Sequence, residues 1–324
     1  MAESTHRPGV CNDLYAGDDD RFDVLDVHHH VGRSAQFSES HRPAASHREQ
    51  YSPSRDLQAR LSAMDLLGVR QAVLLPTHAY LRPRGLPDTQ AVNNAVAEYR
   101  LRSPSRFPAI FGVAEPAYGP DGLPEIARLK ALGFAGISFH VRFQGPTLTA
   151  PLMFDYIGEV CAQRLVPIIH IAAEVCDEAL WRLEELASTF PDTTFIAVDV
   201  FGSREAARQS FMVARRTENI LFDTSLAGDL DLLLAFSREL GAHRLTYGTD
   251  LHSNQAARGK HILCGIIESR DLADKEKSMI LGGNARKILQ LGPQAPPGRP
   301  EADREATRTG PPRSSGRGTA MEPT

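Results

Sequence analysis

Short apolar runs rich in Val and Ile alternate along the chain with longer stretches whose apolar residues recur at helical spacing. Such runs are typical of strands buried on both faces, as in a parallel sheet. We predict eight strands, at 24–31, 71–77, 109–116, 134–140, 166–172, 194–200, 220–225 and 244–250. Eight strand–helix repeats favour a (β/α)₈ TIM barrel of the α/β class. An open, doubly wound sheet is the alternative, because periodicity alone does not distinguish the two.

The intervals between the strands predict helices. We expect Ser54 to cap the first helix and Gly68 to end it, because these residue types favour the two positions. Further helices are predicted at 122–132 and 151–164, and a later one should end at Gly241.

The chain has 324 residues, and a barrel of this type typically takes about 250. We therefore predict a flexible N-terminal extension over 1–21, one barrel domain over 22–291 and a tail over 292–324. The tail is rich in Pro, Gly, Arg and Ser. Such a composition buries too little apolar surface to order itself, so disorder is expected there.

Composition narrows the range of partners. The net charge of −4 argues against nucleic acid or an anionic membrane as the main partner. The polar N-terminus lacks the apolar segment of a secretory signal, and no uncharged apolar stretch is long enough to span a membrane. We expect a cytoplasmic protein that binds a small-molecule substrate, and a homodimer is left open.

The first strand carries two histidines that a strand period would place on one face, His28 and His30. Two neutral imidazoles on one face can bind a cation such as Zn²⁺. An exposed turn or a satisfied polar cluster more often explains an isolated pair, but the position at the end of a strand counts against both. His29 should face the other way and serve packing.

Two further polar residues lie where strands are expected to be buried, His170 in the fifth strand and Asp250 at the end of the eighth. An unpartnered imidazole or carboxylate is costly to bury. The alternatives are backbone hydrogen bonds for His170 and a helix N-cap for Asp250. Because the carboxyl ends of barrel strands meet at one face, these residues and the first-strand pair should converge. A structural protein rarely shows that joint pattern.

Several blocks resemble the amidohydrolase-related branch of the amidohydrolase superfamily, which includes aminocarboxymuconate-semialdehyde decarboxylase and aromatic-acid decarboxylases. The blocks are DVHHHVG (26–32), GFAGISFH (133–140), RLVPIIHIA (164–172), NILFDTS (219–225), HRLTYGTD (243–250) and GGNARKIL (282–289). The resemblance runs from about residue 22 to 291. It implies a barrel with one divalent metal ion, Zn²⁺ first and Mn²⁺ as the alternative. The implied ligands are His28, His30, His170 and Asp250.

The same resemblance implies that Asp250 contacts the metal and accepts a proton from water. One position departs from the family pattern: the usual histidine at the end of strand 6 is replaced by Asp199. An aspartate can bind metal or act as a base, but it cannot carry a positive charge. Asp199 is therefore a catalytic candidate, with a purely structural role as the alternative.

Four further residues are expected at the rim, one of them His78, which directly follows the second strand. His140 ends the fourth strand, and an imidazole with a near-neutral pKa suits proton transfer. Arg142 could grip a substrate carboxylate through its planar fork, and His252 is a second candidate for substrate binding. Exposed loop positions are the alternative for these residues.

These observations predict a metal-dependent hydrolase that cleaves a C–N or C–O bond of a small molecule. The alternative is a non-oxidative decarboxylase of an aromatic or unsaturated acid, which needs an arginine directed at the metal. A third hypothesis is a catalytically degenerate barrel that binds a ligand, and Asp199 is its main support.

Overall fold

A computed structural model describes residues 21–32, 52–253 and 259–292 of the chain. Contacts divide the chain into a unit Met1–Gly292 and a unit Pro293–Thr324, and all described residues belong to the first. Of the predicted extension over 1–21 and the predicted tail over 292–324, only Arg21 and Gly292 are among the described residues.

The described residues form eight parallel strands, each somewhat shorter than its predicted range. They are β1 (Leu25–Val31), β2 (Gln71–Pro76), β3 (Phe111–Val113), β4 (Gly136–Phe139), β5 (Val166–His170), β6 (Phe195–Val198), β7 (Ile220–Asp223) and β8 (Leu245–Thr246). Strands β3 to β8 pair in chain order, and β1 pairs with β2. Bridges from His29 to Leu251 and from Leu74 to Ile110 join the two parts on both sides. The sheet therefore closes into the predicted (β/α)₈ barrel, and the open sheet is excluded.

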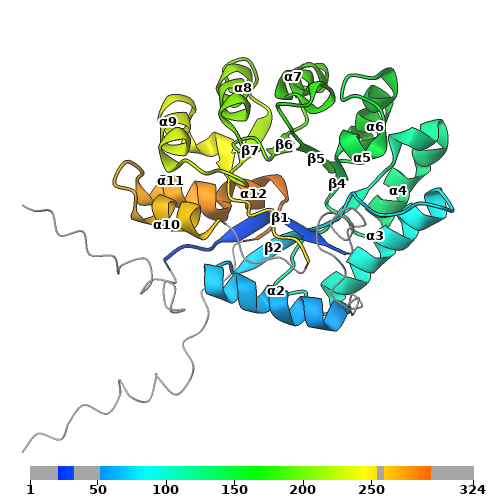
Figure 1. Cartoon of the computed structure of the whole chain (residues 1–324), viewed down its shortest axis with the longest axis horizontal. Helices are drawn as coiled ribbons and strands as arrows, with labels where there is room; N and C mark the ends of the chain where they lie inside the picture. Colours follow the sequence, from blue (N-terminus) through cyan, green and yellow to red (C-terminus); the bar gives the residue numbers. More distant parts are fainter. Residues whose placement is uncertain (1–20, 33–51, 254–258, 293–324) are drawn as a thin grey trace, which may run out of the picture. The chain divides into compact units, whose positions relative to one another are not determined.

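Helices follow the strands around the barrel, with α2 to α9 arranged about the strands in chain order (Figure 1). Their bounds are α2 (Pro53–Leu67), α3 (Leu86–Leu101), α4 (Pro124–Ala131), α5 (Val141–Gln144), α6 (Pro151–Ala162), α7 (Leu180–Thr189), α8 (Arg204–Ala214), α9 (Leu230–Leu240), α10 (Lys260–Glu268), α11 (Asp274–Ser278) and α12 (Asn284–Ile288). Among the described residues, no helix combines the length and the hydropathy needed to cross a bilayer.

The predicted end of α2 is confirmed, but its predicted start is wrong. Gly68 ends the helix in the left-handed conformation, with φ of 76°, which glycine adopts without a steric penalty. The N-cap is Ser52 and not Ser54, and the Ser52 side chain makes no capping hydrogen bond. Pro53 begins the helix because a proline in the first turn lacks only an N–H group that would have no partner there.

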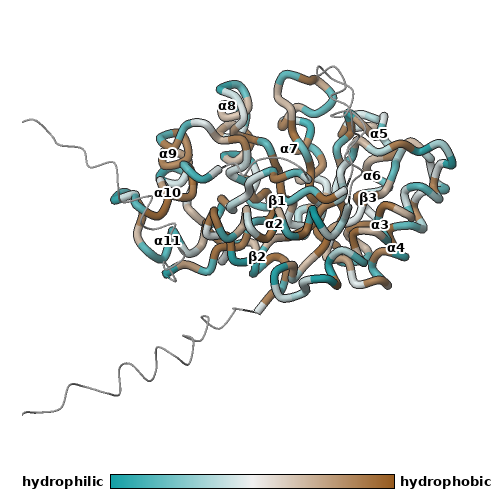
Figure 2. Tube along the Cα trace, turned by 60° about the horizontal axis from the view of Figure 1, so that its bottom comes forward, coloured by the Kyte–Doolittle hydropathy of each residue, from teal (hydrophilic) through white to brown (hydrophobic). Residues whose placement is uncertain are grey.

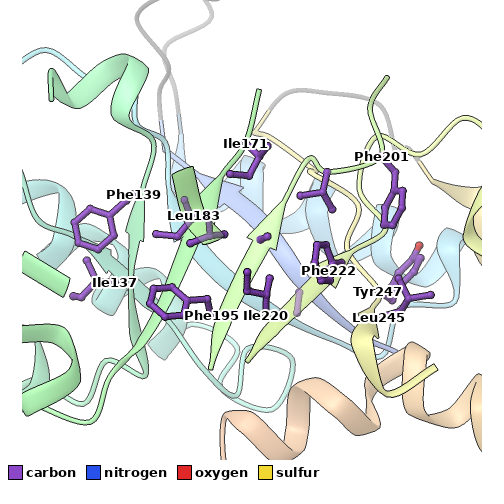
Figure 3. Packing of buried hydrophobic residues seen from close by; sticks show 14 of the residues in the cluster. Ile137, Phe139, Ile171, Leu183, Phe195, Phe201, Ile220, Phe222, Leu245 and Tyr247 are labelled. Carbon is purple, nitrogen blue, oxygen red and sulfur yellow. The ribbon is translucent and has the colours of Figure 1, made fainter. Parts of the chain in front are cut away.

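The core has two layers. An inner cluster fills the barrel with residues from β1, β2, β3, β5 and β6, and Ala285 of α12 joins it. A larger outer cluster packs the strands against the helices, and Phe195, Ile220 and Phe222 lie along neighbouring strands in this layer (Figure 3). Apolar and polar residues alternate along the outer helices (Figure 2), as expected when one helix face is buried. These layers fix the strands, and thereby the positions of the side chains at their carboxyl ends.

Candidate metal centre

A β-bulge in β1 directs the two histidines into the barrel. Leu25 and Val27 belong to the inner cluster, so unbroken alternation would turn His29 inward and both His28 and His30 outward. The register with β2 shifts between residues 26 and 29, where the extra residue of β1 has no partner of its own. Such a bulge resets the alternation. His28 and His30 therefore share the inner face, and His29 is buried on the other side, as predicted.

Three imidazoles from two strands meet inside the barrel. The Nε2 atom of His28 lies 3.0 Å from that of His30 and 3.2 Å from that of His170. The Nε2 atoms of His30 and His170 are also 3.2 Å apart. Oδ1 of Asp250 lies 3.5 Å from Nε2 of His28 and 3.6 Å from Nε2 of His30. The structure thus brings together all four residues that the sequence analysis named as ligands.

The opposite nitrogen of each imidazole has an acceptor. Nδ1 of His30 lies 3.0 Å from the carbonyl oxygen of Pro76, and Nδ1 of His170 lies 3.1 Å from that of Phe139. Nδ1 of His28 lies 3.1 Å from a carboxylate oxygen of Asp223. A proton on each Nδ1 leaves three Nε2 lone pairs facing a common point, which is unfavourable unless a cation lies there. The donor set of three imidazoles and a carboxylate fits a divalent ion such as Zn²⁺ or Mn²⁺.

Two carboxylates at the mouth stand on strained backbone. Asp199 and Asp250 have φ of 66° and 54°, in the left-handed region that aspartate tolerates better than most residues. Each such residue costs on the order of 1–3 kcal/mol, and such strain concentrates at functional sites. Ligand atoms of both carboxylates and of His28 lie within 4.8 Å of one another. The turns after β6 and β8 therefore aim two acids at the histidine centre.

The pKa values show how negative this centre is. Burial lowers the pKa of His28, but Asp199, Asp223 and Asp250 outweigh it and raise that pKa to about 10. Burial raises the pKa of Asp199 to about 8. The neighbouring His28 opposes this rise, whereas the negative charges of Asp250 and Asp223 add to it. A site that holds a proton this strongly on an imidazole favours positive charge, so it can accept a cation in place of that proton.

Other histidines surround the ligands. His252 stacks on His30 with ring centroids 4.4 Å apart, and its Nε2 lies 3.0 Å from Oδ1 of Asp250. His140 stacks on His170 at 4.6 Å. Burial, and next the charge of Arg142, lowers the pKa of His140 to about 3. The expectation of a near-neutral pKa for His140 is therefore wrong: at neutral pH it is an uncharged hydrogen-bonding group.

Arg142 is paired with Glu178 and does not point freely at the centre. Its guanidinium NH2 lies 3.2 Å from Oε2 of Glu178, and its backbone N–H donates to Oε1 at 2.8 Å. The Arg142 side chain is 46% exposed, and Nε2 of His140 lies 3.3 Å from Oε1 of the same Glu178. The arginine therefore supports the rim next to His140.

Sequence reasoning assigned no role to Asp223 or Glu178, and it placed His78 only at the rim. Nε2 of His78 lies 2.8 Å from Oγ of Ser138, and its ring meets that of His170 edge-on at 5.0 Å. Asp223 could have been recognised from the sequence, because it is a carboxylate at the end of an apolar strand, much as Asp250 follows one. Glu178 lies in a short 3₁₀ segment, Cys176–Glu178, and carried none.

A family model for amidohydrolases matches residues 25–291. The chain belongs to the amidohydrolase family. This confirms the resemblance drawn from the six sequence blocks and the prediction of an enzyme from this superfamily. No curated protein is matched by the sequence.

Enzymes whose solved structures share this fold catalyse different reactions. One is 5-carboxyvanillate decarboxylase from Novosphingobium aromaticivorans, complexed with manganese and 4-hydroxy-3-methoxy-5-nitrobenzoic acid, at 14% identity and a TM-score of 0.64 over 85% of this chain and 98% of that one. Another is 4-oxalomesaconate hydratase from Rhodopseudomonas palustris, at 16% identity and 0.60 over 83% and 96%. A third is a probable 2-pyrone-4,6-dicarboxylic acid hydrolase from Acinetobacter baumannii, at 15% identity and 0.56 over 83% and 100%. The likeness confirms the barrel and leaves the reaction to the site.

Proposed function

We propose that the chain is a metal-dependent hydrolase that cleaves a C–N or C–O bond of a small molecule. The observation that carries this proposal is the convergence of three imidazole Nε2 atoms, 3.0–3.2 Å apart, beside Oδ1 of Asp250. Zn²⁺ is the proposed ion, because it favours nitrogen ligands of this kind. Mn²⁺ is the alternative, since a decarboxylase of the same fold binds manganese.

His28, His30, His170 and Asp250 would hold the ion. A divalent cation in such a site lowers the pKa of water and polarises a substrate carbonyl. Asp250 is the proposed general base, because its carboxylate lies next to the imidazole nitrogens and can take a proton from the attacking water. His252 orients that carboxylate through its 3.0 Å contact with Oδ1, and it is the proposed contact to the substrate on this side.

Asp199 and His140 are the second candidates for proton transfer. Asp199 lies on the opposite side of His28, with Oδ1 4.0 Å from Nδ1, and keeps part of its surface exposed. His140, which is uncharged and stacks on the ring of His170, can form a hydrogen bond with the substrate. Arg142 is proposed to contact substrate only at the outer rim, since Glu178 already pairs with it.

Hydrolysis is favoured over decarboxylation by the charges that face the centre. Asp250 lies beside the imidazole nitrogens, where its carboxylate would repel a substrate carboxylate. Among the described residues, the rim arginines Arg82 and Arg142 pair with Glu115 and Glu178, so neither offers a free charge to hold that carboxylate. Decarboxylation remains the second candidate, because a decarboxylase of this fold binds manganese and an aromatic acid.

The test is a product analysis of the protein loaded with Zn²⁺ or Mn²⁺. Amides, lactones and aromatic acids are supplied in ¹⁸O-labelled water, and products are identified by mass spectrometry. Hydrolysis places label from water in the product acid, whereas decarboxylation releases CO₂ and shortens the acid. His28→Ala, which removes one ligand, is the inactive control. Metal binding without turnover of any compound would favour the degenerate, ligand-binding barrel.

A further inference from the structure

The buried carboxylate of Asp223 joins three elements behind the histidine centre. It ends β7 and is fully buried. Its Oδ2 lies 3.1 Å from Nδ1 of His28. Its Oδ1 accepts a hydrogen bond from the backbone N–H of Asp199 at 3.0 Å and another from the hydroxyl of Ser225 at 2.7 Å. Both oxygens therefore have donors, and one of these donors is an imidazole of the centre.

The backbone next to this carboxylate leaves room for it. Gly248 lies just after β8, and a Cβ atom there would collide with Oδ2 of Asp223 and lie 3.1 Å from Cβ of His28. Its φ is not in the left-handed region, so space and not backbone conformation requires the glycine. Any side chain at this position would push the carboxylate away from the imidazole. The glycine and the aspartate thus form one arrangement around a single ring.

We propose that Asp223 is the positioning residue that holds the His28 imidazole with its proton on Nδ1 and its Nε2 lone pair directed at the metal. The proposal rests on the metal site of the proposed function and goes beyond it, because Asp223 itself does not reach the ion. Partners of this kind raise the basicity of a ligand imidazole and fix its orientation. The Nδ1 atoms of His30 and His170 are held in the same way by backbone carbonyl oxygens. His28 alone of the three depends on a charged side chain for it.

Asp223→Asn separates this role from mere packing, because it keeps the shape and removes one acceptor. If the amide oxygen keeps its bonds to Asp199 N–H and Ser225, the NH₂ group faces Nδ1 of His28. The imidazole then loses its charged acceptor, and a proton on Nδ1 is left with only the hydroxyl of Ser225, 3.1 Å away. A shift of that proton to Nε2 would remove the lone pair that a metal needs. If the amide is flipped, its NH₂ group opposes the N–H of Asp199, which then keeps only the hydroxyl oxygen of Ser225 as an acceptor, 3.1 Å away. Of the two side chains, only the carboxylate can accept a hydrogen bond from His28, Asp199 N–H and Ser225 at the same time.

The test measures Zn²⁺ affinity by competition with a chromogenic chelator, in the wild type, Asp223→Asn and Gly248→Ala. We expect both variants to bind Zn²⁺ about 10–100-fold more weakly, the range typical of lost outer partners of metal ligands. The control is Asp88→Asn, which changes a buried aspartate of α3 that pairs with Arg84, and it should leave the affinity unchanged.

A spectroscopic readout separates positioning from a general loss of structure. In the Zn²⁺-loaded wild type, ¹H–¹⁵N spectra of the imidazoles should show a strongly deshielded Nδ1 proton on His28, because a carboxylate accepts it. Asp223→Asn should shift or remove that signal and leave those of His30 and His170 in place. Gly248→Ala covers the case in which Asp223→Asn fails to fold, since it displaces the carboxylate without removing it.

The outcomes distinguish the two proposals. Unchanged affinity and an unchanged His28 signal in folded Asp223→Asn would overturn the positioning role and leave the hydrolase proposal intact. A wild type that binds neither Zn²⁺ nor Mn²⁺ would overturn the metal-dependent function, and the positioning role with it. Weaker binding in Asp223→Asn and Gly248→Ala, with the Asp88→Asn control unaffected, supports the inference.

Discussion

Asp250→Asn is the substitution that most directly tests the proposed chemistry. The amide keeps the size of the carboxylate and still offers one oxygen to a metal, but it is a poor base. Residue 250 has φ of 54°, which asparagine tolerates nearly as well as aspartate. Alanine would instead add backbone strain, on the order of 1–3 kcal/mol, and confuse the result. The asparagine variant therefore isolates the loss of proton acceptance.

The expected effect follows from the position of Oδ1, 3.5 Å from Nε2 of His28 and 3.0 Å from Nε2 of His252. Loss of a general base typically lowers turnover about 10²–10⁴-fold, which corresponds to about 2.7–5.4 kcal/mol of transition-state stabilisation. We expect a nearly unchanged melting temperature and partial retention of metal. The assay is kcat with a substrate from the product analysis, together with metal content by elemental analysis. The exposed Asp155→Asn on α6 is the matched control.

Wild-type turnover in a metal-loaded Asp250→Asn protein would refute the reasoning. The base would then have to be Asp199 or His140, and the corresponding variants would be measured next. A loss of turnover that follows a loss of metal would instead identify Asp250 as a ligand without a separate role as a base.

Four further outcomes are expected. His28→Ala should lose most bound metal, measured by elemental analysis, because two imidazoles are too few for a stable site. Metal affinity, measured by calorimetry, should rise with pH. The carboxylates keep a proton on His28 in the metal-free protein, with a pKa of about 10. Below that pH, metal binding must displace the proton, which lowers the affinity about tenfold per pH unit for each proton displaced. Gly136→Ala should lower the free energy of unfolding by about 1–3 kcal/mol in urea, because its Cβ would collide with Phe111; Gly228→Ala, which meets no atom within 4 Å, is the control. A chain that ends at Gly292 should keep its melting temperature, since that unit has its own contacts, and a clear drop would show that the remainder stabilises it.

Local patterns in the sequence were enough to predict the architecture. The eight apolar runs correspond to the eight strands, because strands buried on both faces require continuous apolar residues. Gly68 and Gly241 end helices where predicted, because a positive φ at a helix end favours glycine. The error at Ser54 arose where two serines and a proline compete for the same helix start, and neither serine makes a side-chain capping bond in the structure.

The sequence also identified the metal-ligand candidates, because His28, His30, His170 and Asp250 all lie in or directly after apolar strands, and a barrel brings strand ends together. It could not determine which way the first-strand histidines face. Alternation counted from Leu25 and Val27 would have turned them outward, and the bulge that reverses this depends on the pairing of β1 with β2.

Only the tertiary structure determined how the site is held and charged. Asp223 and His28 are 195 residues apart in the chain, and no local pattern links them. The same holds for Glu178, which neutralises Arg142 and so alters the predicted role of that arginine. The pKa of His140 depends on how deeply its ring is buried against His170. Periodicity reports which face of an element is buried, whereas hydrogen-bond partners and desolvation depend on residues that only the closed barrel brings into contact.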